Sequence, residues 1–281
     1  MCGIKLNKNY RYNTVKTLTK YFLKSLYARA EIWLMFTSVL LVFAVFIINT
    51  ARSVNRDLFV VSPNIYEGPI YISVIFVCIF SSYLQVLHIS RDIDSRVYES
   101  YLYGPVDEIS YIAGIFITYS LINLIAIVFL PFMWILIITL LMGLLPSAAA
   151  FAGLIYGYFL SNLILFITMC IAAAAKKSKL SILYLLIFHF ICTGIVLADT
   201  VISRFLIPLR RSDVDMFSFF RRLFHTLFEI SVYFSPYTQF FLFLQNFYHY
   251  LSMAVIFSVV VLASQVLFAW LSQYLFKGSI K

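Results

Sequence analysis

The side chains best suited to binding another protein gather in one short polar segment, residues 91–108. Its candidate contact residues are Asp92, Asp94, Arg96, Val97, Glu99, Tyr101 and Pro105. Ile93, Val97 and Tyr101 recur every four residues, so a helix would present them as one apolar stripe beside the charges. Such a stripe is suited to docking in a partner's groove, where the acids would pair with basic groups. The alternative is an ordinary solvated loop, kept out of apolar surroundings by its charges.

The chain lacks the sequence motifs of several common catalytic sites. It has no G-x-x-x-x-G-K-[ST], the loop whose backbone cradles nucleotide phosphates. It also lacks H-E-x-x-H, a nucleophile elbow and paired intramembrane acids, and its four histidines lie far apart in the sequence. The four cysteines have no spacing typical of a disulfide framework or a zinc site. We therefore expect a protein that is not an enzyme and has no cofactor or metal of its own.

The composition is typical of an integral membrane protein. Of the 281 residues, 63% are hydrophobic and 12% are charged, whereas about a quarter of a soluble domain is charged. Long uncharged tracts cover residues 32–51, 68–90, 109–175, 180–198 and 230–276. The net charge of +9 arises mainly at the predicted membrane boundaries, where basic residues contact the lipid bilayer. We do not interpret it as nucleic-acid binding.

These tracts predict an all-α integral membrane protein, because about 20 apolar residues cross a bilayer. We predict six transmembrane helices, at residues 32–50, 69–90, 110–142, 148–175, 180–198 and 252–274. The run 109–175 must cross twice, because it would make about 100 Å of helix. Proline removes a backbone donor, so we place the break at Gly143–Pro146 and expect a kink at Pro131. Residues 1–31 would form a separate N-terminal helix, and residues 32–281 the transmembrane domain.

The N-terminal 31 residues predict a basic amphipathic helix. Its apolar positions are Val15, Leu18, Phe22, Leu23 and Leu26, and Lys16, Lys20 and Lys24 lie on another face. Such a helix would lie on an anionic membrane surface; a basic anchor that sets the topology is a second, compatible interpretation. Fourteen of the 21 basic residues fall in residues 1–31, 91–108, 176–179 and the C-terminal tail. This asymmetry places both termini in the cytoplasm.

Residues 199–250 differ from the spans around them. Charges and Pro236 interrupt their apolar faces, so we expect short outward-facing helices that enter the bilayer partway. Their aromatic residues would form an interfacial belt or line a path for an amphipathic substrate. Within the spans, Asn123, Asn162 and His189 are candidates for a substrate path, although Asn123, Asn162 and also Gln265 more often bridge helices. No chain of charged residues crosses the spans, which weighs against a proton or ion relay.

The polar segment resembles the cytoplasmic loop of permeases of type-2 ABC exporters. In that family a stretch E-x-E-R-G-T-x-E-x-L-x-x-x-P forms a coupling helix against the ATPase subunit. Asp92 and Asp94 match the leading acids, Glu99 the last one and Pro105 the proline, and Gly114 matches a glycine that opens the next span. The stretch Phe234-Ser235-Pro236-Tyr237 is similar to an S-P-aromatic stretch before the last span of the family. The chain departs from the pattern at Ser95, Arg96 and Val97, which replace Arg-Gly-Thr, at Tyr101, which replaces Leu, and at Ile115.

The resemblance implies a multi-pass cell-membrane subunit of an ATP-driven exporter. A separate soluble P-loop ATPase would bind ATP and Mg²⁺ and dock on residues 91–108, and a second permease copy or a paralogue would complete a dimer. The substrate would be a glycan, a lipid, a hydrophobic peptide or a drug. The alternatives are a membrane scaffold or assembly subunit without a transport path, and a secondary transporter.

Overall fold

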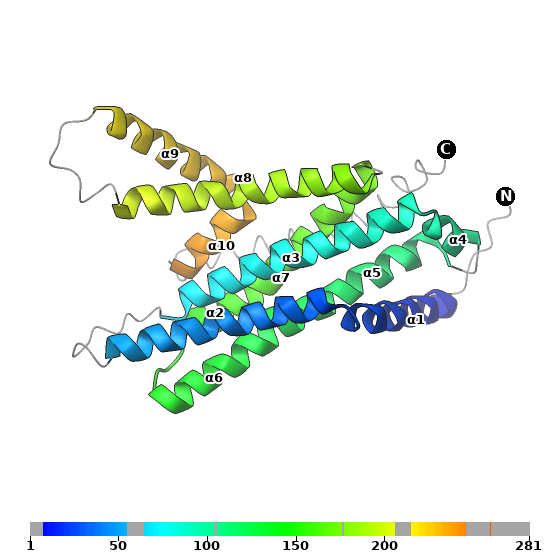
Figure 1. The fold of residues 1–281 in the computed structure, drawn as a ribbon, viewed down its shortest axis with the longest axis horizontal. Helices are drawn as coiled ribbons and strands as arrows, with labels where there is room; N and C mark the ends of the chain where they lie inside the picture. Colours follow the sequence, from blue (N-terminus) through cyan, green and yellow to red (C-terminus); the bar gives the residue numbers. More distant parts are fainter. Residues whose placement is uncertain are drawn as a thin grey trace.

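The computed structural model describes residues 8–54, 65–103, 106–175, 177–205, 215–245 and 259, and the regular elements in these ranges are all helices (Figure 1). They are α1 (Lys8–Tyr27), α2 (Ala30–Val54), α3 (Glu67–Asp94), α4 (Val97–Tyr103), α5 (Glu108–Asn123), η1 (Leu124–Phe129), α6 (Leu130–Met142), α7 (Ala148–Ala175), α8 (Ser178–Phe205), α9 (Asp215–Phe234) and α10 (Pro236–Gln245). The π-helical η1 joins α5 and α6 into one long helix.

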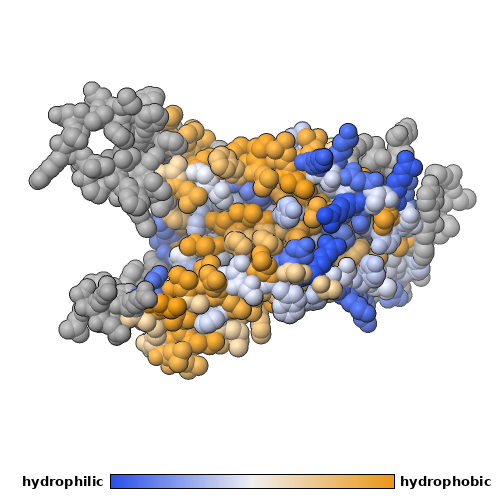
Figure 2. Space-filling view, in the orientation of Figure 1, coloured by the Kyte–Doolittle hydropathy of each residue, from blue (hydrophilic) through white to orange (hydrophobic). Residues whose placement is uncertain are grey.

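Five helices are long and apolar enough to cross a membrane: Ala30–Ala51, Glu67–Asp94, Glu108–Met142, Ala148–Ala175 and Ser178–Ala198. They agree with the first five predicted spans and support a multi-pass membrane protein. Apart from Val259, the sixth predicted span (252–274) lies outside the described residues. Figure 2 shows apolar residues over much of the bundle and hydrophilic residues gathered at the end that carries α1 and α4.

The third span is disturbed just before the proline at which a kink was predicted. Within η1 the hydrogen bonding shifts by one residue, and the N–H of Leu130 donates to the carbonyl of Ile125. Pro131 has no backbone N–H and cannot donate a hydrogen bond to the preceding turn. A missing helical hydrogen bond of this kind favours a π-helical turn. α6 then ends where the sequence predicted, at Gly143, which adopts a φ of 69° and donates its N–H to Thr139 at 2.9 Å.

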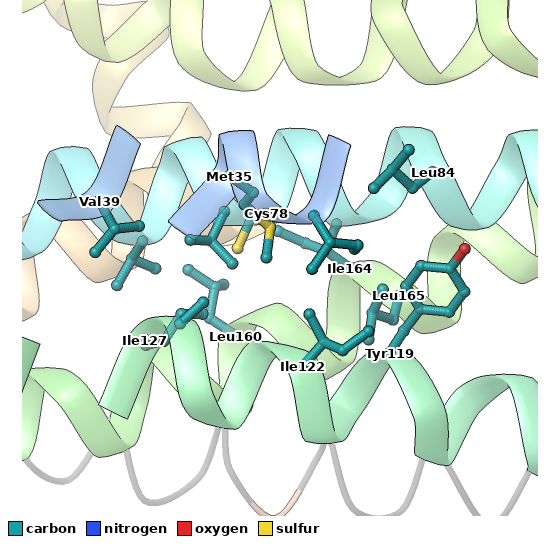
Figure 3. Packing of buried hydrophobic residues seen from close by; sticks show 14 of the residues in the cluster. Met35, Val39, Cys78, Leu84, Tyr119, Ile122, Ile127, Leu160, Ile164 and Leu165 are labelled. Carbon is teal, nitrogen blue, oxygen red and sulfur yellow. The ribbon is translucent and has the colours of Figure 1, made fainter. Parts of the chain in front are cut away.

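The centre of the bundle is built around the contact between α3 and α7. A Cβ atom on Gly157 would lie 2.7 Å from Cγ2 of Val74, and one on Gly153 would lie 2.5 Å from Cδ2 of Leu244. Glycine at both positions therefore lets helix backbones approach closely, as in membrane G-x-x-x-G pairs. Figure 3 shows the apolar core beside them, where α2, α3, η1 and α7 contribute Met35, Cys78, Ile127 and Leu160. The glycine pair was not predicted from the sequence, although a G-x-x-x-G spacing indicates close helix packing.

Residues 215–245 form a helical hairpin of α9 and α10. α9 packs along α8, and α10 turns back to contact α3, α7 and α8 (Figure 1). α10 begins at Pro236 and buries Tyr237 and Phe240 completely. Its ten residues make about 15 Å of helix, half of the roughly 30 Å hydrocarbon core. Short helices were predicted here; α10 is short, whereas α9 has 20 residues, and residues 199–205 continue α8.

Candidate functional site

The candidate partner-binding segment consists of two helices separated by a sharp turn. α3 continues to Asp94, and α4 starts at Val97. Between them Arg96 adopts a φ of 57°, and its N–H donates to the carbonyl of Ile93 at 3.2 Å. A left-handed residue with this hydrogen bond is a common helix C-terminus, usually occupied by glycine. The prediction of one continuous apolar stripe was therefore wrong, because the turn at Arg96 separates Ile93 from Val97 and Tyr101.

The two leading acids of the segment bind groups of their own chain. Asp92 accepts a hydrogen bond from the Tyr111 hydroxyl of α5 at 2.5 Å and lies 3.8 Å from Nε2 of His88. Asp94 accepts one from the backbone N–H of Ser178 at 3.1 Å, at the first turn of α8. A carboxylate suits this position because the first N–H groups of a helix lack helical partners and carry partial positive charge. Both acids therefore brace the bundle; Asp94 is also exposed, and its contact with a partner stays a prediction.

The remaining candidates divide between the bundle and the surface. The ring of Tyr101 lies 5.5 Å from that of Tyr111, and Tyr101 packs against the core, as does Ile93. Burial raises the pKa of Tyr101, with smaller contributions from Tyr21 and Asp92.

Three other candidates have side chains that no described residue engages in a hydrogen bond or ion pair. Arg96 and Val97 are exposed. Glu99 is half-buried and makes no hydrogen bond or ion pair with any described residue. Pro105 lies outside the described residues. The surface that α4 offers is therefore smaller than the sequence suggested, and Glu99 is its available acid.

A buried polar and aromatic cluster lies beneath α4 and joins α1, α3 and α5. Nδ1 of His88, on α3, lies 3.5 Å from the hydroxyl of Tyr119, on α5. The ring of Phe22 from α1 packs edge-on against His88, with centroids 5.1 Å apart, and against Tyr111. A movement of α4 would therefore reach three helices through side chains that are already in contact.

The N-terminal helix is part of this bundle. Leu18, Phe22 and Leu26 are buried, and a Cβ on Gly114 of α5 would lie 3.1 Å from the Cβ of Leu18. The Arg11 guanidinium, through Nε, also forms an ion pair with Asp107 at 3.1 Å. The apolar face predicted to rest on a membrane surface is therefore mostly covered by the protein, and the lysine face remains exposed.

The three residues proposed for a substrate path are all buried in the bundle. His189 of α8 is buried and bridges two helices: its Nε2 lies 2.7 Å from Ser82 Oγ on α3, and its Nδ1 lies 2.8 Å from the Tyr237 hydroxyl on α10. Asn123 is fully buried and Asn162 is 5% exposed. Neither the amide of Asn123 nor Oδ1 of Asn162 has a hydrogen-bond partner among the described residues. His189 therefore connects the hairpin to the bundle, a bridging role that was not predicted for it.

The described residues contain no group of three or more His, Cys, Asp or Glu side chains arranged to hold a metal ion. No protein-family model, no curated protein and no solved structure matches the chain.

Proposed function

We propose that this chain is the membrane subunit of an ATP-driven exporter, with ATP hydrolysed by a separate P-loop ATPase that binds α4. The observation that carries the proposal is the position of α4. It is a short helix at the hydrophilic end of the bundle, between two candidate spans (Figures 1 and 2). It presents Val97 and Glu99 while Tyr101 packs into the bundle.

The backbone at Arg96 supports the same proposal. In the coupling-helix pattern of type-2 exporter permeases, the position of Arg96 is glycine. This chain carries no glycine there, yet Arg96 adopts the left-handed conformation that glycine adopts without steric cost. The backbone at Arg96 thus has the conformation that a glycine would favour, although the residue type differs from that of the family pattern.

A partner could move the spans because α4 is braced on both sides. The turn at Arg96 ties it to α3, and the contact of Tyr101 with Tyr111 ties it to α5. The hydrogen bond from Tyr111 to Asp92 then connects α3 and α5 directly. Packed interfaces of this kind move as rigid bodies between discrete arrangements, so a push on α4 would tilt both helices together.

The proposed orientation places both termini in the cytoplasm. α1, α4 and the start of α8, all from segments predicted to be cytoplasmic, lie at the same end of the bundle (Figure 1). The hairpin of α9 and α10 would then face outward, beside a path shared with a second permease copy or a paralogue. The proposed substrate is hydrophobic, amphipathic or lipid-linked.

The proposal can be tested by photo-crosslinking. A photoreactive amino acid at Val97, in the full-length protein in its native membrane, is expected to crosslink to a soluble protein that contains a P-loop. Glu99→Lys should then reduce copurification of that ATPase, because reversing one charge of a desolvated pair costs about 2–5 kcal/mol or more. Glu229→Lys is the matched control, since Glu229 is an exposed acid on α9. Crosslinks that never contain an ATPase, or equal copurification with both variants, would refute the assignment and favour a scaffold or a secondary transporter.

A further inference from the structure

The exposed face of α1 carries a regular row of basic and aromatic residues. With 3.6 residues per turn, Tyr12, Lys16, Lys20, Lys24 and Tyr27 fall on one side of the helix. The opposite side holds Leu18, Phe22 and Leu26, which are buried in the bundle. Because that apolar side is fixed against α5, the direction in which the lysines point is fixed as well.

Among the described residues, no acid pairs with these lysines. α1 contains no Asp or Glu, and Lys16, Lys20 and Lys24 are exposed and form no ion pair with any described residue. Arg11, by contrast, is neutralised by Asp107. The row is therefore a fixed cationic surface available for an anion.

Two aromatic residues indicate where this surface meets the membrane. α2, the first candidate span, begins only three residues after α1 ends. At this junction Trp33 is 55% exposed and donates its indole N–H to the carbonyl of Tyr27 at 3.0 Å, and Tyr27 is 37% exposed. Exposed Trp and Tyr at the end of a span are typical of the membrane–water interface.

The helix rise then sets which lysines can reach the lipid. Figure 1 shows α1 continuing from α2 along the bundle, so depth changes by about 1.5 Å per residue. Lys24 lies about 4.5 Å beyond Tyr27 and Lys20 about 10 Å, whereas Lys16 lies about 16 Å away. The head-group layer of one leaflet is about 5–8 Å thick, and long lysine side chains extend toward it. Lys24 and Lys20 are within reach of it, and Lys16 is not.

We propose that Lys20 and Lys24, together with Tyr27 and Trp33, form a binding site for the head group of an anionic phospholipid. The lysines supply the charge, and the aromatic pair holds the acyl-chain boundary beside them. An acidic soluble protein would not require exposed aromatic residues at the start of a span, so the surface fits a lipid better. This site is independent of α4 and of the proposed exporter function.

The experiment compares lipid binding to purified full-length protein by native mass spectrometry. The probes are phosphatidylglycerol and phosphatidylcholine, and the variants are Lys20→Gln/Lys24→Gln and the matched control Lys8→Gln/Lys16→Gln, which removes two charges from the part of α1 beyond the reach of the head groups. A lysine near a charged surface contributes a factor of about five, so the first variant should weaken phosphatidylglycerol binding by roughly 30-fold. The control should change it little, and Lys24→Gln alone should have a larger effect than Lys16→Gln.

Several outcomes would overturn the site. Equal losses in the two double variants, or no preference for phosphatidylglycerol in the original protein, would show that the surface binds no specific lipid. Competition by millimolar inorganic phosphate would indicate a soluble-anion site. A loss of ATPase copurification with unchanged lipid binding would assign the lysine face to a protein partner. Size-exclusion profiles of the variants should match that of the original protein, and a variant that fails this comparison would be replaced by Lys20→Ser/Lys24→Ser.

Discussion

The hydrogen bonds of His189 should hold the α9–α10 hairpin in the bundle, and their contribution to the free energy of unfolding can be measured. Ser82 Oγ donates to the carbonyl of Ile79 at 2.9 Å, which leaves it as an acceptor toward His189. A neutral imidazole has one donor and one acceptor nitrogen. The network therefore assigns the proton to Nε2, with Nδ1 accepting from the Tyr237 hydroxyl.

His189→Phe removes both nitrogens and keeps an aromatic ring. The buried Tyr237 hydroxyl then loses its partner, which costs about 1–3 kcal/mol. Ser82 loses less, because it keeps its bond to Ile79. Since side-chain hydrogen bonds between membrane helices average about 0.6 kcal/mol and reach about 1.7, we expect the free energy of unfolding to fall by about 1–2 kcal/mol.

A double-mutant cycle with Tyr237→Phe separates the bond from simple loss of packing. Each single change strands one polar atom, whereas the double change strands neither, so the double variant should lose about 1 kcal/mol less than the sum. Unfolding would be followed by circular dichroism in mixed micelles with increasing denaturing detergent. The control cycle combines His189→Phe with Tyr66→Phe. The Tyr66 hydroxyl donates to the carbonyl of Leu144 at 2.8 Å and not to His189, so these two losses should add. Additive losses for His189 and Tyr237 would refute the proposed bridge.

Two further predictions concern the backbone. Gly157→Leu should lower the free energy of unfolding by about 1–3 kcal/mol, because the side chain would collide with Val74. Gly68→Leu is the control and should be tolerated, since no atom lies within 4 Å of a Cβ there. Equal losses for the two variants in the same detergent assay would contradict this prediction. Arg96→Gly should raise the thermal midpoint slightly and Arg96→Val lower it, because a left-handed residue costs roughly 1–2 kcal/mol for side chains other than glycine. The opposite order of midpoints would show that the turn is not left-handed in solution.

The first five spans could be predicted because the membrane simplifies the problem. A chain in hydrocarbon must satisfy its backbone hydrogen bonds locally, so an uncharged tract of sufficient length becomes a helix. The same reasoning located the helix end at Gly143 and the disturbance near Pro131, since glycine and proline act through their own backbones. The hairpin break at Pro236 was predicted for the same reason.

The direction of an amphipathic face could not be predicted from its pattern. Leu18, Phe22 and Leu26 would be equally stable against lipid or against α5, because both surroundings are apolar. The lysine face, by contrast, was predicted correctly, since charges remain exposed in either case.

The sequence by itself thus determined which segments are helical and which faces avoid water. Only the tertiary structure decided which polar side chains meet. Asp92 finds Tyr111 across 19 positions, and His189 finds Ser82 across 107. No local pattern predicts such pairs, because each depends on how several helices pack at once. For the same reason the sequence did not predict that Asp92 and Asp94, the most prominent acids of the candidate site, form hydrogen bonds with α5 and α8.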